Sequence, residues 1–323
     1  MKAVVQEGSG SSDVLTVRET PVPELTDDRV LIRVYATSVN ALDYHTVHGG
    51  LILRIATKVM RQKPDPIRGV DVSGRVEAVG KNVTSLHPGD DVFGVAHGAW
   101  AEFASAAERG LAPKPARLSF AEAGAVGVAA FTALQAVRDH GRVGPGKRVL
   151  IYGAGGGVGT FAVQIAKALG AHVTAVTGPR NVDLISSLGA DEIVDYTKED
   201  VLRRGERYDA IIDVAATRPL GALRRGLKDG GTLVMVGAAK NGGWLAIFGR
   251  IFAQVIRSRV LKQRVVMFVA KTRPDDLAFL KQLIDEGKVT PLIDREYPLA
   301  EIRDAVGYAM SGQGRAKVVI KVR

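Results

Sequence analysis

The sequence predicts an α/β protein in which a doubly wound parallel sheet is joined to a second, β-rich domain. A glycine cluster at residues 153–159 directly follows the apolar run 149–152, as happens where a buried strand turns sharply into a helix. From Phe120 onward, helical patterns alternate with buried-strand patterns, which is typical of a parallel sheet covered by helices. Before about Pro115, short alternating runs lie between Gly and Pro turns, which indicates a small antiparallel barrel or sandwich.

The β-rich region is expected to contain strands over residues 30–34, 70–79 and 91–95. The later elements are expected, in order, as a helix over 120–139, a strand over 149–152, a helix from Val158 to Leu169, a strand over 172–177, a helix over 182–188, strands over 193–194 and 208–214, a helix through Leu223, strands over 232–236 and 265–269, a helix over 274–286, a strand over 292–297, a helix over 299–310 and a strand over 316–322.

The composition is that of an ordinary globular protein. At 323 residues the chain is longer than the size at which a single hydrophobic core stops growing, so we expect two domains. The chain contains no cysteine, which excludes disulfides, thiolate zinc sites and cysteine nucleophiles. Its net charge of +10 is scattered rather than gathered in a motif, so we expect an anionic cofactor and no nucleic acid as partner. The first residues hold no apolar stretch of signal-peptide length, which favours a cytoplasmic location.

The glycine cluster predicts a site for a phosphate-bearing cofactor. Residues without a Cβ let backbone N–H groups and a helix N-terminus approach a pyrophosphate closely. The spacing is G-x-x-G-x-x-G over Gly153, Gly156 and Gly159, so the strict dinucleotide fingerprint is not met. A glycine-rich turn without a ligand is the alternative, but a predicted strand, helix and second strand frame the cluster and favour a dinucleotide.

The residues after the second strand favour NADPH over NADH. A site selective for NAD carries an acidic side chain there, which binds the ribose 2′-hydroxyl. No carboxylate occurs between Thr177 and Asp183. Thr177, Gly178 and Arg180 instead offer a hydroxyl, an open backbone and a cation, which suit a 2′-phosphate. For Arg180, a solvated surface arginine is the alternative.

A segment at residues 244–261 is apolar but carries three arginines. It is too short and too charged to span a membrane. One interpretation is a basic amphipathic helix lying on a membrane surface. The interpretation favoured here is a helix that packs over the cofactor cleft or into a dimer interface.

Several motifs together resemble one protein family. They are, in order, VNALDYH at 39–45, RGVDVSGRVEAVG at 68–80, PGDDVFG at 88–94, FTALQA at 131–136, the glycine turn, SLGADEIVDY at 187–196, GGTLVMVG at 230–237, and GKVTPLIDREYPL and GRAKVVI near the C-terminus. Their order and spacing are similar to those of the medium-chain dehydrogenase/reductase superfamily, and within it of the zinc-independent quinone oxidoreductase and enone reductase branch. The resemblance implies a GroES-like catalytic domain made from residues 1–122 and 271–323, a Rossmann NADP-binding domain over 123–270, an active cleft between them, and a homodimer.

Two departures from the zinc-dependent alcohol dehydrogenases of that superfamily predict chemistry without a metal. Asn40 stands where those relatives carry a cysteine ligand, and Gly69-Val70-Asp71 stands where a GHE motif supplies a histidine. Asn and Val supply neither the thiolate nor the imidazole that zinc favours. The hydride acceptor must then be electron-poor already, as quinones and α,β-unsaturated carbonyls are, because the arriving charge spreads onto an oxygen.

The resemblance places Asn40 beside the nicotinamide and the substrate as a positioning or polarising group. Asp43 belongs to the same motif, and Tyr44 is a candidate proton donor. A turn-stabilising role is the alternative for Asn40, and a cap at a helix or turn is the alternative for Asp43. His45 and His48 are interpreted as ordinary surface histidines rather than general acids.

The resemblance also implies a set of cofactor contacts. They are Gly156, Gly157, Val158 and Gly159 at the pyrophosphate; Thr177, Gly178 and Arg180 at the adenosine phosphate; Tyr196 near the adenosine end; Thr132, Val236, Gly237, Phe268 and Val269 along the nicotinamide; and Lys317, with Arg315 as a weaker candidate, reaching a phosphate or ribose.

Two other functions remain open beside an NADPH-dependent reductase of quinones or enones. An enoyl-thioester reductase of the same superfamily would hold an acyl chain in a pocket lined by Leu51, Ile52, Ile55 and Val59. Leu51 stands near the position where some quinone reductases carry a tyrosine, which leaves the substrate open. An NADPH-binding partner protein with little turnover would be anchored through residues 244–261.

Overall fold

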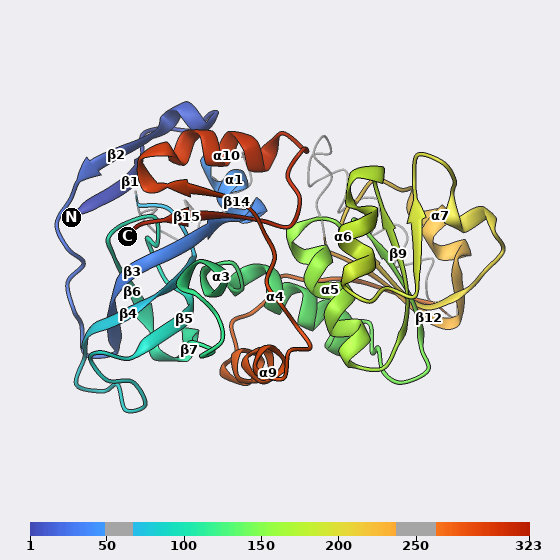
Figure 1. The fold of residues 1–323 in the computed structure, drawn as a ribbon, viewed down its shortest axis with the longest axis horizontal. Coiled ribbons are helices and arrows are strands. Elements are labelled where there is room, and N and C mark those ends of the chain that lie inside the picture. The colour runs from blue at the N-terminus through green and yellow to red at the C-terminus, as the bar shows by residue number, and fades with distance from the viewer. Residues whose placement is uncertain (49–66, 237–262) are drawn as a thin grey trace. The chain divides into compact units, whose positions relative to one another are not determined.

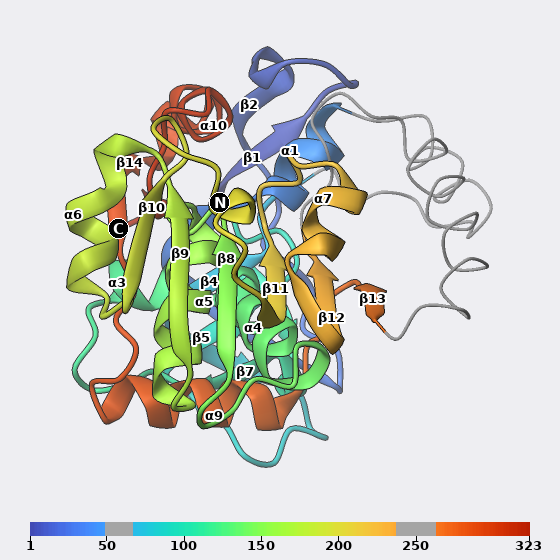
Figure 2. The ribbon, with the colours of Figure 1, turned by 90° about the vertical axis from the view of Figure 1, so that its right-hand side faces the viewer.

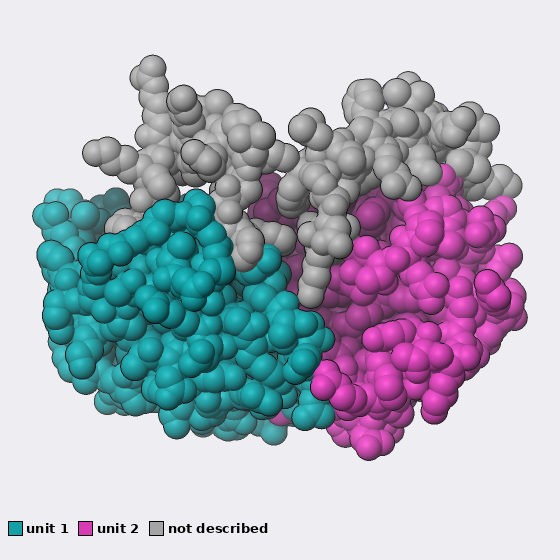
Figure 3. All heavy atoms as spheres, turned by 90° about the horizontal axis from the view of Figure 1, so that it is seen from above, with its two compact units in different colours: residues 1–131, 272–287, 291–323 teal, residues 132–271, 288–290 magenta. Residues whose placement is uncertain are grey.

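The structure is a computed structural model that describes residues 1–48, 67–236 and 263–323 (Figure 1). The chain divides into two compact units: unit 1 comprises residues 1–131, 272–287 and 291–323, and unit 2 comprises residues 132–271 and 288–290 (Figure 3). The sequence analysis divided the chain at 122/123 and 270/271, whereas the compact units change at 131/132 and 271/272. The first change comes later because the helical segment after Phe120 begins against the sheet of unit 1. A Cβ on Gly124 would lie 3.0 Å from the carbonyl carbon of Ala36.

Unit 1 is built on a seven-stranded sheet in the order β14-β15-β3-β4-β5-β7, with β6 paired to β3. The strands are β3 (Arg29–Val39), β4 (Asp71–Val79), β5 (Asp91–Val95), β6 (Phe103–Ala107), β7 (Leu111–Pro113), β14 (Ile293–Pro298) and β15 (Lys317–Lys321). All neighbouring pairs are antiparallel except β14 with β15. Because β15 pairs with β3, the end of the chain completes the sheet that its first part begins. This confirms the predicted GroES-like barrel domain.

The burial pattern of β3 prepares the site of unit 1. Burial alternates along the first half of the strand, so that Val30, Ile32 and Val34 enter the core, as the two-residue period of a strand requires. From residue 36 to the end of the strand, every residue is buried, including the polar Thr37 and Ser38. Buried hydroxyls need hydrogen-bond partners, so this end of β3 must face other polar groups.

Unit 2 contains a six-stranded sheet in the order β10-β9-β8-β11-β12-β13, with all neighbouring strands parallel (Figure 2). The strands are β8 (Arg148–Tyr152), β9 (His172–Thr177), β10 (Glu192–Asp195), β11 (Tyr208–Asp213), β12 (Leu227–Met235) and β13 (Arg264–Met267). The helices α5 (Gly157–Ala168), α6 (Val182–Ser187) and α7 (Leu220–Arg225) follow β8, β9 and β11. The predicted doubly wound parallel sheet is confirmed. β12 begins at Leu227 rather than at residue 232, because the glycine pair at 230–231 conceals the start of the strand in the sequence.

The single helix predicted over residues 120–139 is wrong. The segment forms α3 (Phe120–Gly124), then α4 (Gly127–Leu134), then a π-helical turn η3 (Gln135–His140). The break has a physical reason, because the first amides of a helix lack partners within it, and the amide of Val128 donates a 2.7 Å hydrogen bond to Asp71 Oδ1. A Cβ on Gly127 would lie 2.0 Å from the same oxygen, so only glycine fits at this helix start.

The remaining elements complete the two units. They are β1 (Lys2–Gln6) paired with β2 (Leu15–Glu19), α1 (Ala41–His48), α9 (Pro274–Asp285), α10 (Ile302–Met310), and the short 3₁₀ turns η1 (Ser12–Val14), η2 (Glu108–Gly110), η4 (Pro179–Asn181), η5 (Val201–Arg203) and η6 (Leu299–Glu301). Within the described ranges, no helix has both the length and the apolar character needed to cross a bilayer. The predictions for residues 244–261, for Gly237 and for the pocket at Leu51, Ile52, Ile55 and Val59 lie outside the described residues.

Candidate active site

A fully buried carboxylate forms the centre of a polar cluster in unit 1. Asp71 begins β4, and its Oδ2 accepts hydrogen bonds from Ser38 Oγ and from Asn40 Nδ2, the latter at 2.9 Å. The amide of Val128 donates to Oδ1, and the ammonium of Lys317 lies 3.3 Å from Oδ2. A buried carboxylate is costly unless donors and an opposite charge surround it. The hydroxyl of Ser38, the carboxamide of Asn40, the backbone amide of Val128 and the ammonium of Lys317 together meet that requirement.

The ammonium of Lys317 is the cation of this cluster. Its side chain is only 3% exposed, and Nζ donates to Asn40 Oδ1 at 2.6 Å, to the carbonyl of Val39 at 3.3 Å and to Asp71 Oδ2 at 3.3 Å. An ammonium carries three donors, so these three oxygens use all of them. Lys317 was predicted to reach a phosphate or ribose of the cofactor, and that contact stays a prediction; in this structure its donors bind within the cluster.

Asn40 is held at both ends of its side chain. Lys317 donates to Oδ1, while Nδ2 donates to Asp71. Because an ammonium only donates, the oxygen of the carboxamide must face Lys317, and the nitrogen must face the carboxylate. Nδ2 has a second N–H, which Asp71 does not take. The sequence-based prediction that Asn40 positions or polarises a substrate therefore rests on that second N–H.

Asp43 caps the helix that follows Asn40. The backbone N–H of Asn40 donates to Asp43 Oδ2 at 2.8 Å, which satisfies an amide at the start of α1. Burial raises the pKa of Asp43 to about 7, and the nearby charge of Asp71 raises it further than Lys317 lowers it. Tyr44 is the next residue of α1 and is half-buried. The cap interpretation of Asp43 is thus present in the structure, while the catalytic roles of Asp43 and Tyr44 stay predictions.

The donor set of this cluster does not fit a zinc ion. Among the side chains that the structure describes, those around Asp71 supply two oxygens of one carboxylate, a hydroxyl and a carboxamide, and neither a thiolate nor an imidazole. The positively charged ammonium of Lys317, 3.3 Å from Oδ2, already neutralises the carboxylate. Zinc sites in proteins use thiolate, imidazole and carboxylate ligands, and a second cation at this place is repelled by Lys317.

The glycine turn of unit 2 is packed too tightly for side chains. A Cβ on Gly159 would lie 2.1 Å from the carbonyl oxygen of Gly153, and Gly153 itself has a φ of +78°, which favours glycine. Gly156 is the N-cap of α5 and offers no side-chain oxygen to the first amides of the helix. Those amides, including the ones of Gly157 and Val158, are the donors that a pyrophosphate binds at a helix N-terminus.

Asn181 completes this turn and was missed by the sequence analysis. A Cβ on Gly155 would lie 2.3 Å from Asn181 Nδ2 and 2.8 Å from Thr177 Oγ1, so both side chains lie directly over the glycine. The Oδ1 atom of Asn181 is buried and has no hydrogen-bond partner within the described part of the chain. A buried polar atom without a partner marks a place for a ligand or water. The only signal in the sequence was an asparagine in the loop after the second strand.

Three residues predicted at the adenosine end of the cofactor come together at the ends of β9 and β10. The amide of Tyr196 donates to the carbonyl of Thr177 at 3.1 Å. A Cβ on Gly178 would lie 3.2 Å from the hydroxyl of Tyr196, so the phenol lies beside the glycine. Tyr196 is 57% exposed, and Arg180 is exposed in the turn η4 that follows. An exposed aromatic ring beside an open backbone suits a stacked adenine.

Several buried polar atoms without hydrogen-bond partners among the described residues lie at the carboxyl edge of the sheet of unit 2. Within the described ranges, buried side-chain atoms without hydrogen-bond partners include Tyr152 OH, Asp195 Oδ2 and Asp213 Oδ2, at the ends of β8, β10 and β11. Burial raises the pKa of Asp213, whereas hydrogen bonds from Thr197 lower the pKa of Asp195. In parallel sheets this edge is where ligands bind. Together with the glycine turn, these atoms fit a dinucleotide.

The described residues predicted along the nicotinamide lie in α4 or directly after β12 and β13. Thr132 belongs to α4, and Val236 follows β12. Phe268 and Val269 follow β13, where the ring of Phe268 packs 4.3 Å from that of His140. Val269 is 82% exposed, an unusual position for a large apolar side chain. Its contact with the nicotinamide stays a prediction.

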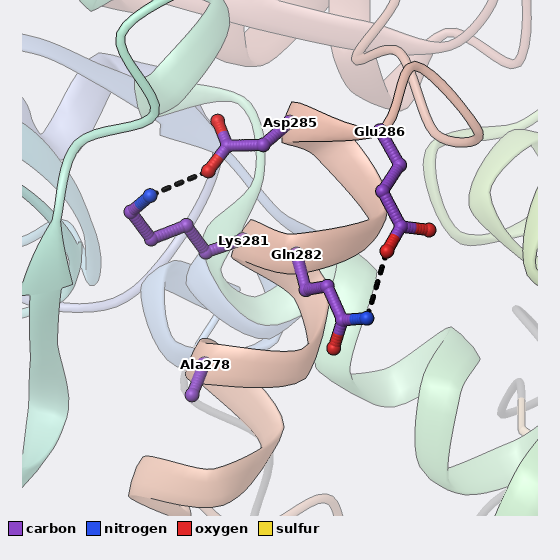
Figure 4. Close-up of a pocket in the computed structure, with 5 residues that line it drawn as sticks. All are labelled: Ala278, Lys281, Gln282, Asp285 and Glu286. Carbon is purple, nitrogen blue, oxygen red and sulfur yellow. Dashed lines mark hydrogen bonds and ion pairs between the residues drawn. The ribbon is translucent and has the colours of Figure 1, made fainter.

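A hollow on the surface of α9 does not compete with these sites. Figure 4 shows its lining residues on one helix, Ala278, Lys281, Gln282, Asp285 and Glu286. Lys281 donates to Asp285 at 2.5 Å and Gln282 donates to Glu286 at 2.8 Å, both four residues apart along the helix. These polar groups bind one another, so the hollow presents no group directed at a ligand.

The comparisons with known proteins agree with this geometry. The chain matches the family model described as an alcohol dehydrogenase GroES-like domain over residues 26–116 and that described as a zinc-binding dehydrogenase over residues 188–320. It is similar to a chloroplast envelope quinone oxidoreductase homolog of Arabidopsis thaliana, with 33% identity over 97% of this chain and 95% of the relative. It is also similar to a chloroplastic NADPH-dependent alkenal/one oxidoreductase of the same plant, with 30% identity over 99% of this chain and 79% of the relative.

The fold has a close match among solved structures. The quinone oxidoreductase from Coxiella burnetii superposes with a TM-score of 0.86 and 32% identity, over 100% of this chain and 99% of that chain. The two family models, the relatives matched along nearly the whole chain, and this shared fold show that the chain belongs to the medium-chain dehydrogenase/reductase superfamily of oxidoreductases, in the branch of the quinone oxidoreductases and enone reductases.

Proposed function

We propose that the chain transfers a hydride from NADPH to a quinone or an α,β-unsaturated carbonyl without a metal ion. The observation that carries the proposal is the fixed carboxamide of Asn40, held between Lys317 and Asp71 where a metal-dependent relative would place a zinc ligand. The names of the similar proteins, a quinone oxidoreductase homolog and an alkenal/one oxidoreductase, support the same class of acceptor.

Unit 2 provides the residues that would hold the cofactor. The amides at the start of α5 bind the pyrophosphate, and Thr177, Gly178 and Tyr196 bind the adenosine end. The absence of a carboxylate between Thr177 and Asp183 supports NADPH, because a carboxylate there repels a 2′-phosphate. When bound, NADPH supplies the hydride, and the protein supplies position and electrostatics.

The residues of unit 1 act on the acceptor. Negative charge that reaches a conjugated carbonyl collects on its oxygen, and a fixed N–H stabilises charge there without reorganisation. We assign this role to the second N–H of Asn40, which Lys317 and Asp71 hold in orientation. We assign the final proton to Tyr44, because a phenol can donate a hydrogen bond and a proton through its O–H. No step requires a metal ion.

A panel of acceptors tests this proposal. Purified protein, with its zinc content measured, is assayed for NADPH oxidation with quinones, alkenals and enoyl thioesters. We expect turnover with quinones or alkenals. The rate of this turnover should stay the same when a metal chelator is added. Turnover confined to enoyl thioesters would contradict the proposed acceptor and show an enoyl-thioester reductase instead. Tight NADPH binding without turnover on any acceptor would refute the proposal.

The proposal extends to assembly and location. We propose a homodimer, as the family resemblance implies, and a cytoplasmic location, with a small molecule as the only substrate partner. Light scattering in solution measures the mass of the particle, and a monomer mass contradicts the first point. Fractionation of the source cells tests the second, because the relatives named above are chloroplast proteins.

A further inference from the structure

Two buried glutamines hold the chain at the places where it leaves unit 2. The chain passes from unit 2 to unit 1 after Lys271 and again after Thr290. Gln135 Nε2 donates to the carbonyl of Lys271 at 2.6 Å, and the amide of Lys271 donates to Gln135 Oε1 at 3.1 Å. Gln164 Nε2 donates to the carbonyl of Thr290 at 3.1 Å, and the amide of Thr290 donates to Gln164 Oε1 at 2.8 Å. The two contacts have the same form.

A carboxamide that makes both bonds to one residue fixes more than a single hydrogen bond does. Its donor and acceptor lie side by side, as on a β-strand, so they set the position and the orientation of the bound backbone. Gln135 is 2% exposed and Gln164 is 6% exposed, so water does not compete for these bonds. An apolar side chain would fill the same space but would fix no orientation of the backbone.

Each glutamine is itself fixed to an element that the proposed function uses. Gln164 belongs to α5, the helix of the glycine turn, and its Nε2 also donates to the carbonyl of Thr160 at 3.1 Å. Gln135 is the first residue of the π-helical turn η3. In this turn the amide of Gly141 donates a 2.8 Å hydrogen bond to the carbonyl of Ala136, five residues earlier. Turns of this kind are rare and occur frequently at functional sites.

The segment held by Gln135 carries two of the residues predicted along the nicotinamide. Phe268 packs on His140 of η3, and Lys271 is bound by Gln135 at the start of the same turn. Val269 lies between these two anchored residues and is 82% exposed. The segment is thus fixed at both ends while its middle faces outward.

We propose that Gln135 and Gln164 are positioning residues for hydride transfer. This inference rests on the proposed function, in which the cofactor contacts of unit 2 hold the hydride donor. The two glutamines fix the outgoing chain to the elements that hold the pyrophosphate and the nicotinamide. They thereby fix the two segments at which the chain leaves unit 2, without touching substrate or cofactor themselves.

The test compares Gln135→Met and Gln164→Met with a matched control, Gln263→Met. Gln263 also binds backbone, donating to the carbonyls of Arg224 at 3.0 Å and Leu227 at 3.3 Å, but it lies at no passage between the units. We expect the two test variants to lose about tenfold to a hundredfold in kcat, with the Kd for NADPH changed by less than about threefold, because misplacing reacting groups costs rate rather than affinity. Gln263→Met is expected to keep wild-type kcat.

Amide hydrogen exchange gives a second measurement that does not depend on activity. Gln135→Met should accelerate exchange at Lys271 and leave Thr290 unchanged, and Gln164→Met should do the reverse. If the wild-type protein turns over and both test variants keep its kcat, the inference is overturned and the proposed function still stands. Unaltered exchange at Lys271 and Thr290 would also overturn it. A wild-type protein without turnover on quinones and enones would remove the proposed function and this inference with it.

Discussion

The buried ammonium of Lys317 donates a 2.6 Å hydrogen bond to Oδ1 of Asn40, a residue 277 positions earlier in the chain. The last strand of the chain therefore fixes the side chain of the one residue between β3 and α1. Because an ammonium only donates, the contact also decides which end of the carboxamide carries the oxygen. The available N–H of Asn40 is oriented by a contact that no local stretch of sequence contains.

Replacing this lysine should be costly. Lys317→Met leaves the buried carboxylate of Asp71 without its cation, and breaking one side of a buried ion pair costs about 3–5 kcal/mol. We expect a loss of that size in the free energy of unfolding, measured with urea, together with a lower kcat. The control is Lys321→Met on the same strand, whose ion pair with Glu296 is exposed and worth less than about 1 kcal/mol. Equal stability of the two variants would contradict the cluster as described.

The raised pKa of Asp43 predicts a pH dependence of stability. Burial raises this pKa to about 7 in the folded chain, above the ordinary carboxyl value of the unfolded chain. Between about pH 4 and about pH 7 the folded chain keeps a proton that the unfolded chain releases, so rising pH favours unfolding. The stabilisation by protonated Asp43 is full below about pH 4 and is lost as pH rises to about 7.

Asp43→Asn removes this titration while keeping an oxygen for the amide of Asn40. The stability of the variant relative to wild type should therefore rise with pH, by up to about 4 kcal/mol between about pH 4 and about pH 8. Urea unfolding of both proteins across this range measures the difference. Asp27→Asn, at an exposed carboxylate paired with Lys81, is the control and should show a nearly constant difference. A constant difference for Asp43→Asn as well would show that the carboxyl titrates normally.

The sheet of unit 2 and the glycine turn were predictable because their signals are local. Apolar strands, helical spacing and glycines within a few residues of one another determine β8, the turn and α5. The helix predicted over 120–139 was wrong because every residue around its break is apolar or small. The break depends on Asp71, more than fifty residues earlier, which takes the amide of Val128.

The buried groups of the site were predictable only in part. Asn40 and Asp43 share a short motif, which made both candidates from the sequence. Lys317 stands near the C-terminus between two other basic residues, Arg315 and Lys321, where a lysine is usually solvated. Its burial follows from the pairing of β15 with β3. Asn181, Gln135 and Gln164 carry no pattern that distinguishes them from surface amides. Their roles arise from contacts that form only in the fold.

The contact between Gly155 and Asn181 predicts the cost of a single methyl group. Gly155→Ala places a Cβ 2.3 Å from Asn181 Nδ2 and 2.8 Å from Thr177 Oγ1, so these side chains must move away from the turn. We expect the Kd for NADPH to rise at least about tenfold, because both side chains lie beside the turn that is proposed to bind the pyrophosphate. Gly144→Ala, at a position with open space, should leave the Kd unchanged. The double variant Gly155→Ala, Asn181→Ala should recover part of the loss, since it removes the obstructing amide. No recovery would show that Thr177 or the backbone limits the turn.

Gly178 offers the sharpest test of cofactor choice. Gly178→Asp places a carboxylate at the end of β9, where a site selective for NAD carries one and where it repels a 2′-phosphate. The new side chain is sterically tolerable, because a Cβ there would lie 3.2 Å from the hydroxyl of Tyr196, the far end of an exposed side chain. We expect the ratio of the Kd for NADPH to that for NADH to rise at least about tenfold.

Gly178→Asn, of the same size without the charge, should change both constants alike, so the difference between the two variants isolates electrostatics from volume. A ratio that Gly178→Asp does not change would place the 2′-position of the cofactor away from β9, and wild-type preference for NADH would remove the NADPH assignment itself.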